Sequence, residues 1–121
     1  MLVSMMYLIL LINTDRSVGK QVNVIYKKRG EGKTEEIIKR SDKTGCLIVT
    51  VTRKQAKIIR ERAKEMGCYN VNVLSYDEFK IRESLYIGKS ILLDDAEYLL
   101  QRIFNHQLID TISITNTNCE T

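Results

Sequence analysis

A chain of 121 residues with 44% apolar and 28% charged residues has the size and composition of one soluble globular domain, which excludes a multidomain or fibrous architecture. The net charge of +4 is uneven, because residues 16–64 carry 15 Lys or Arg against 5 Asp or Glu, whereas residues 65–121 carry 4 against 9. The basic first half suits the phosphates of a nucleotide or a nucleic acid, although solvated helix faces account for most of these charges. Three cysteines without metal-pair spacing and a single histidine argue against zinc and indicate free thiols in a reducing cytoplasm.

The N-terminal 20 residues open with a strongly apolar segment, residues 1–12. This segment is too short to span a bilayer, and it lacks the basic leader and the small-residue cleavage site of a secretory signal. We expect residues 1–20 to form a buried strand or helix that covers the sheet of a cytoplasmic protein with no membrane partner. A self-association surface and a membrane-touching segment are the alternatives.

The most informative stretch follows a first strand, which is predicted over residues 21–26. It is Lys27-Lys28-Arg29-Gly30-Glu31-Gly32-Lys33-Thr34, and it leads into a helix predicted over residues 33–41. A strand, a glycine-bearing loop ending in Gly-Lys-Thr and a helix form the context of a phosphate-binding loop. Loop N–H groups and the helix N-terminus attract an anion. The predicted nucleotide-binding residues are Arg29, Gly30, Glu31, Gly32, Lys33 and Thr34.

Two of these residues have specific expected roles. Lys33 is expected to reach the terminal phosphates as a catalytic point charge, and the hydroxyl of Thr34 is expected to ligate Mg²⁺. One position departs from the usual G-x-x-x-x-G-K-[ST] pattern, because Lys27 occupies the place of the first glycine. Gly30 and Gly32 still allow the backbone to curl around a phosphate. A basic surface turn that caps a helix is the alternative.

The middle of the chain alternates between apolar runs and amphipathic stretches. Residues 46–51 predict a buried strand and residues 53–66 a helix, which Gly67 is expected to end. Ser75 is expected to cap a short helix over residues 76–80. Further strands are predicted over residues 70–74, 89–93 and 110–115, and a helix over residues 96–105. This alternation predicts an α/β fold with a mostly parallel sheet and helices on both faces, in which the strand C-termini and their loops share one edge.

A second motif supports the first. It is Ile91-Leu92-Leu93-Asp94-Asp95-Ala96-Glu97, a buried apolar strand that ends in an acidic pair. Asp94 is expected to hold the metal, mostly through water, and Asp95 is expected to polarise an attacking water beside the γ-phosphate. The alternative is a solvated turn in which Asp95 caps the following helix.

Together the two motifs resemble those of P-loop NTPases, in particular the branch with an added strand between the motifs. That branch includes helicases, AAA-type ATPases and phage terminase motors. The resemblance covers residues 21–116 and implies a single three-layer α/β/α P-loop core that binds ATP with Mg²⁺. Helicase-like and terminase-like members usually carry Asp-Glu at the second motif. Here the shorter Asp95 occupies the glutamate position, which implies slow hydrolysis or binding without hydrolysis, with Glu97 as a possible substitute.

Two further stretches are similar to parts of the same family. Residues 47–56 look like the strand and Thr-rich turn that helicases place against a nucleic-acid backbone, and they imply DNA or RNA contacts from Thr50, Thr52, Arg53 and Lys54. The alternative is an ordinary strand end with Thr52 capping a basic helix. Residues 112–116 look like a strand that ends in a polar sensor, Asn116 or Thr115, and a polar tail is the alternative.

Full helicases carry a second RecA-like lobe with an arginine finger, and residues 1–121 are not expected to contain one. A protein partner or a second copy would supply the finger, and such a compact core resembles viral or mobile-element versions of the fold. The leading hypothesis is an ATP-binding protein, a weak Mg²⁺-dependent ATPase that works with nucleic acid or a partner. An inactive adaptor or regulator on a degenerate P-loop scaffold and a basic nucleic-acid-binding domain without a nucleotide site are the alternatives. The absence of a guanine-specific Asn-Lys-x-Asp motif favours ATP.

Overall fold

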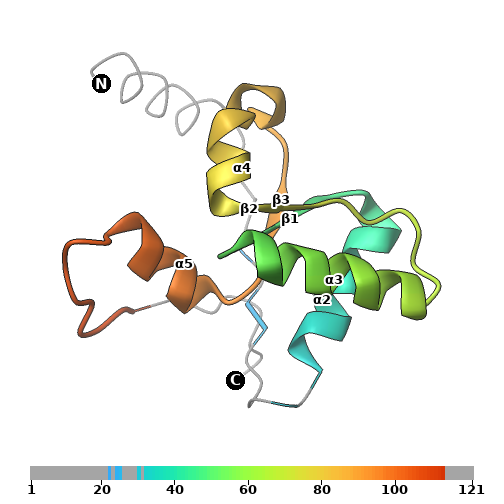
Figure 1. Cartoon of the computed structure of the whole chain (residues 1–121), viewed down its shortest axis with the longest axis horizontal. Helices are drawn as coiled ribbons and strands as arrows, with labels where there is room; N and C mark the ends of the chain where they lie inside the picture. The colour runs from blue at the N-terminus through green and yellow to red at the C-terminus, as the bar shows by residue number, and fades with distance from the viewer. Residues whose placement is uncertain (1–21, 23, 26–29, 31, 114–121) are drawn as a thin grey trace. The chain divides into compact units, whose positions relative to one another are not determined.

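The computed structural model describes residues 22, 24, 25, 30 and 32–113 (Figure 1). Two compact units divide the chain: residues 1–25 with 113–121, and residues 26–112. All the helices and strands described below belong to the second unit, and the predicted covering element at residues 1–20 lies outside the described residues. The elements are α2 (Lys33–Thr44), β1 (Leu47–Thr50), α3 (Arg53–Glu65), β2 (Val73–Ser75), α4 (Tyr76–Ile81), the 3₁₀ helix η1 (Glu83–Tyr86), β3 (Ile91–Leu93) and α5 (Ala96–Ile103).

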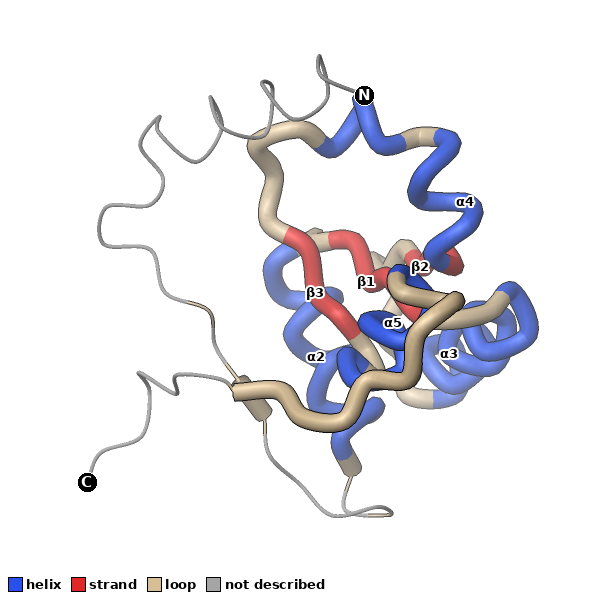
Figure 2. Tube along the Cα trace, turned by 90° about the vertical axis from the view of Figure 1, so that its left-hand side faces the viewer, coloured by secondary structure: helices blue, strands red, loops and turns tan. Residues whose placement is uncertain are grey.

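A small sheet of three parallel strands forms the centre of this unit, in the order β2-β1-β3 (Figure 2). All four residues of the central strand β1 are buried, as expected for a parallel strand covered on both faces. Parallel strands joined by helical crossovers confirm the predicted mixed α/β class. No helix within the described ranges is both long and apolar enough to cross a membrane.

Alternation along β1 divides its side chains between two apolar clusters. Leu47 and Val49 pack with Leu99 of α5, and residues of α4 and η1 surround that cluster. Ile48 and Thr50 point to the opposite face, because successive side chains of a strand alternate. The buried residues of the helices that pack on that side are Ile37, Ile38 and Ser41 of α2 and Ala56, Ile59 and Ala63 of α3.

Local capping explains the boundaries of α3 and α4. The hydroxyl of Thr52 accepts a hydrogen bond from the N–H of Gln55, which starts α3. Gly67 follows the helix with φ 75°, and the next residue donates its N–H to the Ala63 carbonyl, as in a Schellman ending. Ser75 and Glu78 form a complete capping box at the start of α4. The predicted glycine stop and the predicted Ser75 cap are therefore confirmed.

The largest shifts toward later boundaries than the sequence predicts occur at α2 and β2. Helix α2 runs to Thr44 rather than to residue 41, because its left-handed stop is Gly45, whose N–H bonds to the Ser41 carbonyl. Strand β2 begins at Val73 rather than at residue 70. Asn70 instead binds Asp42 through its backbone N–H and its side-chain amide, which ties this segment to the end of α2.

The predicted first and last strands, residues 21–26 and 110–115, are not strands at the positions that the structure describes. Positions 22, 24 and 25 of the predicted first strand carry no strand assignment, and its other positions lie outside the described residues. Residues 110–113 of the predicted last strand are also without a strand, and residues 114 and 115 are not described. The segment before them is held as a loop, because the side chain of Gln101 bonds to the backbone of Gln107 and Ile109.

Candidate nucleotide site

The start of α2 has the backbone of an anion site. Gly32 occupies the N-cap position with φ 82° and ψ 26°, and among the described residues no side-chain hydrogen bond caps this helix start. Gly30 is also left-handed, with φ 85°, a conformation that glycine adopts without steric cost. The first N–H groups of a helix and the positive end of its dipole favour a phosphate at such a position.

An acidic side chain in the first turn of α2 pairs with a cation of α3. Glu35 lies 3.2 Å from Nε of Arg62 on α3, and this ion pair is partly exposed. The two helices are therefore joined across their outer surface, and the Glu35 carboxylate has a cationic partner. The hydrogen bond to Glu65 and then the bond to Glu35 raise the pKa of Arg62, which stays charged.

The carboxyl end of β3 carries a buried acid. Asp94 is only 1% exposed, and its N–H donates to the Val49 carbonyl at 3.0 Å, so it continues the ladder of β1 and β3. Its Oδ2 atom has no hydrogen-bond partner in the part of the chain that the structure describes. Burial, together with the charges of Asp95 and Glu97 and against the charge of Lys33, raises the pKa of Asp94 to about 6.

Lys33 links the start of α2 to the acidic pair at the end of β3. Its Nζ atom lies 3.8 Å from Oδ1 of Asp95, and each side chain is 32% exposed. The structure thus brings the first residue of α2 to the corner between β3 and α5, as the two sequence motifs together predict. Because Lys33 also lowers the pKa of Asp94, its charge acts on both carboxylates of the acidic pair.

Asp95 has an unusual backbone. Among the described residues it is the only non-glycine with positive φ, at 57°. It occupies the N-cap position of α5, but its side chain makes no capping hydrogen bond. The alternative role of Asp95 as a helix cap is therefore not realised by its carboxylate, which faces Lys33. A left-handed aspartate at a strand end is a strained position of the kind that clusters at functional sites.

The other predicted nucleotide residues differ in how well they are placed. Thr34 is half-buried in the first turn of α2. Arg29 and Glu31 lie outside the described residues, as do Thr115 and Asn116 of the predicted sensor. Glu97, the possible substitute for the catalytic glutamate, is exposed in the first turn of α5.

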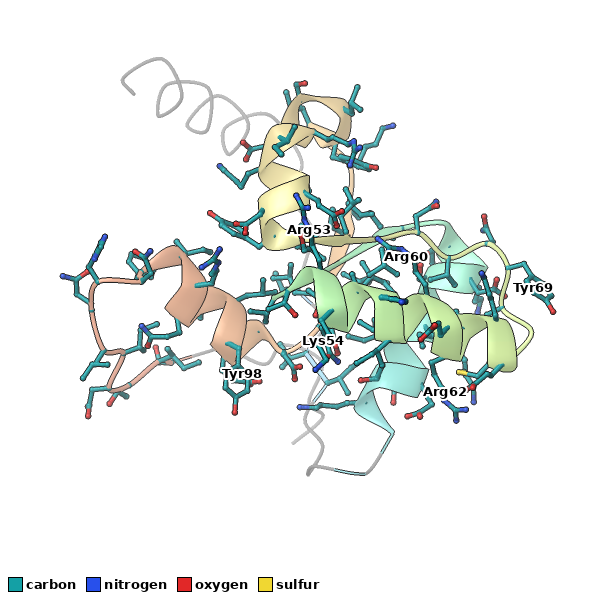
Figure 3. The ribbon with its side chains drawn as sticks, viewed as in Figure 1. Arg53, Lys54, Arg60, Arg62, Tyr69 and Tyr98 are labelled. Carbon is teal, nitrogen blue, oxygen red and sulfur yellow. The ribbon has the colours of Figure 1, made fainter. Side chains whose placement is uncertain are left out.

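The predicted nucleic-acid contacts divide into buried and exposed residues. Thr50 is fully buried, so the prediction that its side chain meets a nucleic-acid backbone is wrong. Thr52 caps α3, as the alternative interpretation expects, and it remains exposed. Arg53 and Lys54 are exposed at the start of α3 and leave the helix on different sides (Figure 3). Arg53 lies 3.9 Å from Glu78, a loose contact that leaves 72% of its side chain accessible.

Thr50 has a second notable feature, a buried hydroxyl close to the acidic corner. Its Oγ1 atom is buried without a hydrogen-bond partner among the described residues. The pairing of β1 with β3 sets Val49 opposite Leu93, so Thr50 and Asp94 are the next pair of neighbours. Alternation within the run of residues 47–50 was the available signal, because it places Thr50 on the same face as the core residue Ile48.

The residues at this corner fit a hydrated magnesium ion better than a cage made of protein ligands. No group of three or more His, Cys, Asp or Glu side chains that could hold a metal occurs within the described ranges. Mg²⁺ commonly binds through one or two carboxylates, with waters and substrate phosphates as its other ligands. The carboxylate of Asp94, close to Lys33 at the start of α2, meets that requirement.

No known protein family, no curated protein and no solved structure matches the chain. The functional proposal therefore rests on the geometry of this corner: a glycine-led helix start, a lysine and a buried carboxylate.

Proposed function

We propose that the chain is a cytoplasmic ATP-binding protein with a P-loop core, a weak Mg²⁺-dependent ATPase that works with nucleic acid or a partner protein. The observation that carries this proposal is the approach of Lys33 at the start of α2 to the Asp94–Asp95 corner. A phosphate at the start of α2 would be within reach of the lysine on one side and face the acidic corner on the other. Such a pairing of cationic and acidic groups is what a magnesium–triphosphate complex requires.

Different residues of this corner would bind the phosphates and the metal ion. The N–H groups after Gly32 and the side chain of Lys33 would bind phosphate oxygens, while Thr34 and Asp94 would hold Mg²⁺. When bound, Mg²⁺ neutralises charge on the phosphate oxygens. Lys33 would exchange its contact with Asp95 for a phosphate, and this exchange would release the Asp95 carboxylate to accept a proton from an attacking water.

Slow turnover follows from the same geometry. Asp95 is a methylene shorter than the glutamate of the resembling families, and its backbone is left-handed. Arg102, the arginine of α5, lies 2.7 Å from Asp77 on the outer surface and is engaged there. A finger would come from a partner or a second copy, and such fingers contribute rate factors of roughly 10³ or more.

The start of α3 supports a nucleic-acid partner. Arg53, Lys54 and Lys57 are exposed there, and one turn further along the Arg60 side chain bonds to the Val73 carbonyl at 2.8 Å. The freely accessible cations would bind phosphates without reading sequence. A titration with single-stranded DNA and RNA at two salt concentrations tests this part, because phosphate contacts weaken as salt rises.

A second candidate function is a catalytically inactive adaptor or regulator. The contact between Asp95 and Lys33 favours it, because an occupied lysine and a short acid disfavour hydrolysis. This candidate predicts ATP binding without phosphate release, and a phosphate-release assay with and without DNA separates it from the ATPase.

The proposal is tested by thermal unfolding with ATP and Mg²⁺. At a hundred times Kd, a ligand specific for the folded state adds about 2.7 kcal/mol, which corresponds to a rise of several degrees in Tm. Lys33→Ala should abolish this rise, whereas Lys39→Ala, an exposed lysine on the same helix, should retain it. An unchanged rise in folded Lys33→Ala would overturn the proposal.

A further inference from the structure

Thr50 is a polar residue in a position that otherwise suits valine. It closes the buried run Leu47–Thr50 of the central strand and has an accessibility of 0%. Valine has almost the same shape, so the hydroxyl is the only group that threonine adds here. That hydroxyl has no hydrogen-bond partner within the described ranges. Burying an unsatisfied hydroxyl costs about 1–3 kcal/mol, so its presence calls for a polar partner.

A second buried atom without a partner lies at the neighbouring strand end. Oδ2 of Asp94 is also unpaired among the described residues. The β1–β3 register that sets Val49 opposite Leu93 makes Thr50 and Asp94 the next neighbours, and the bond from Asp94 N–H to the Val49 carbonyl shows that the pairing extends this far. Backbones of adjacent strands lie about 4.8 Å apart. The two side chains therefore extend from adjacent strands on the same face.

Neither of these two atoms bonds to the other, although both are buried. A water molecule between them would satisfy both, because it can accept from one group and donate to the other. Buried waters of this kind commonly join polar groups that the protein itself leaves unpaired.

We propose that Thr50 is a positioning residue of the nucleotide site, whose hydroxyl orients the Asp94 carboxylate through a bridging water. The hydroxyl donates to the water, and the water donates to Oδ2. This inference rests on the proposed function and deepens it, because it gives the proposed magnesium-holding carboxylate an outer partner. Outer partners of metal-binding carboxylates typically change metal affinity by about 10- to 100-fold when they are removed.

The test compares ATP binding with excess Mg²⁺ and with EDTA, using a fluorescent ATP analogue. Thr50→Val should reduce the Mg²⁺-dependent gain in affinity about tenfold, while the affinity in EDTA stays within twofold of the wild type. Thr50→Ser keeps the hydroxyl and should retain the gain. If Thr50→Val does not fold, Thr50→Ala removes the same hydroxyl and gives the same comparison.

A matched control is available in another buried hydroxyl. Ser41 is also fully buried, but its Oγ donates to the Cys46 carbonyl at 2.7 Å. Ser41→Ala should lower the urea midpoint and leave the Mg²⁺-dependent gain unchanged. This control separates a general loss of packing or hydrogen bonding from a specific effect on the metal-dependent step.

The outcomes distinguish the inference from the function on which it rests. Full Mg²⁺-dependent gain in Thr50→Val, or an equal loss of affinity with and without Mg²⁺, would overturn the role of Thr50 and leave ATP binding standing. Absence of saturable ATP binding by the wild type would overturn the proposed function and this inference with it.

Discussion

Two kinds of helix start occur in this small sheet protein, and they differ in how their first N–H groups are satisfied. Helices α3 and α4 begin at Thr52 and Ser75, whose hydroxyls each accept from a first-turn N–H. Helices α2 and α5 begin at Gly32 and Asp95, and neither has a side-chain cap. Both uncapped starts are left-handed, whereas both capped starts are extended.

The two uncapped helix starts also lie close to each other. Lys33, the first residue of α2, lies 3.8 Å from Asp95, the N-cap of α5. The cap at a capped helix start has a structural explanation, because it satisfies a first-turn N–H within the chain. Where two helix starts without side-chain caps meet beside a buried carboxylate, local capping gives no such explanation. The predictions below test whether the uncapped helix starts bind the nucleotide while the caps of the other two only stabilise the fold.

The largest expected effect is at Asp94. Burial raises its pKa from 3.8 to about 6, so the folded protein binds more protons than the unfolded chain between these values. Stability should therefore fall as pH rises from about 4 to about 6 and stay lower above that. Asp94→Asn removes this loss and should raise the free energy of unfolding by up to ~3 kcal/mol at pH 8. The same variant should lose the Mg²⁺-dependent gain in ATP affinity.

Urea unfolding at several pH values between 4 and 8 measures the effect on stability. The difference between Asp94→Asn and the wild type should grow through the range from 4 to 6 and then stay constant. Glu61→Gln, which alters an exposed carboxylate on α3, is the matched control and should follow the wild type. A pH-independent difference for Asp94→Asn would contradict the assignment of a buried, unpaired carboxylate.

The next effect is expected at the uncapped start of α2. Gly32 has φ 82°, and a Cβ at this position would meet Oε1 of Glu35 at 3.6 Å, an ordinary contact. The cost of Gly32→Ala therefore comes from the backbone and should be about 1–2 kcal/mol. Because the same Cβ would stand where a phosphate approaches, ATP affinity should fall as well. Gly88→Ala is the control, since Gly88 is also left-handed and a Cβ there meets nothing within 4 Å. Normal ATP affinity in Gly32→Ala would place the phosphate elsewhere.

Removal of a helix cap should lower the stability of the fold without changing the affinity for ATP. Ser75→Ala removes the hydroxyl that accepts from the Glu78 N–H at 3.2 Å, and it should lower the free energy of unfolding by about 1 kcal/mol. The Ser75 backbone N–H lowers the pKa of Glu78, and burial opposes this shift. The affinity for ATP, measured by the same fluorescence titration, should not change. A loss of ATP binding in a folded Ser75→Ala protein would erase the distinction between the two kinds of helix start.

The sequence predicted those features that depend on neighbours along the chain. The Ser75 cap, the Gly67 stop and the helix that begins at residue 53 all follow from rules that span a few residues, and the structure confirms them. Burial of Thr50 depends on alternation in a fully covered strand. Its partnership with Asp94 depends on the β1–β3 register, which no local pattern specifies.

The candidate site shows the same limit. Lys33 and Asp95 were predicted to face one site because parallel strands share a C-terminal edge, and that argument depends only on topology. The left-handed backbone of Asp95 was not predicted, because Ala96 and Glu97 suggest an ordinary helix start after an aspartate cap. The left-handed backbone of Asp95 occurs at the junction of β3 and α5. The Asp95 carboxylate pairs with Lys33 there, and it does not cap its own helix.

The smallest expected effect on stability belongs to the Lys33–Asp95 contact. Both side chains are about a third exposed, and such pairs usually contribute less than about 1 kcal/mol. Asparagine tolerates the left-handed backbone, so Asp95→Asn should change the free energy of unfolding by less than about 0.5 kcal/mol. ATP should nevertheless bind up to severalfold more tightly, because Lys33 no longer has to leave a carboxylate, while phosphate release should fall. Weaker ATP binding in Asp95→Asn would mean that Asp95 helps to hold the nucleotide rather than competing with it for the lysine.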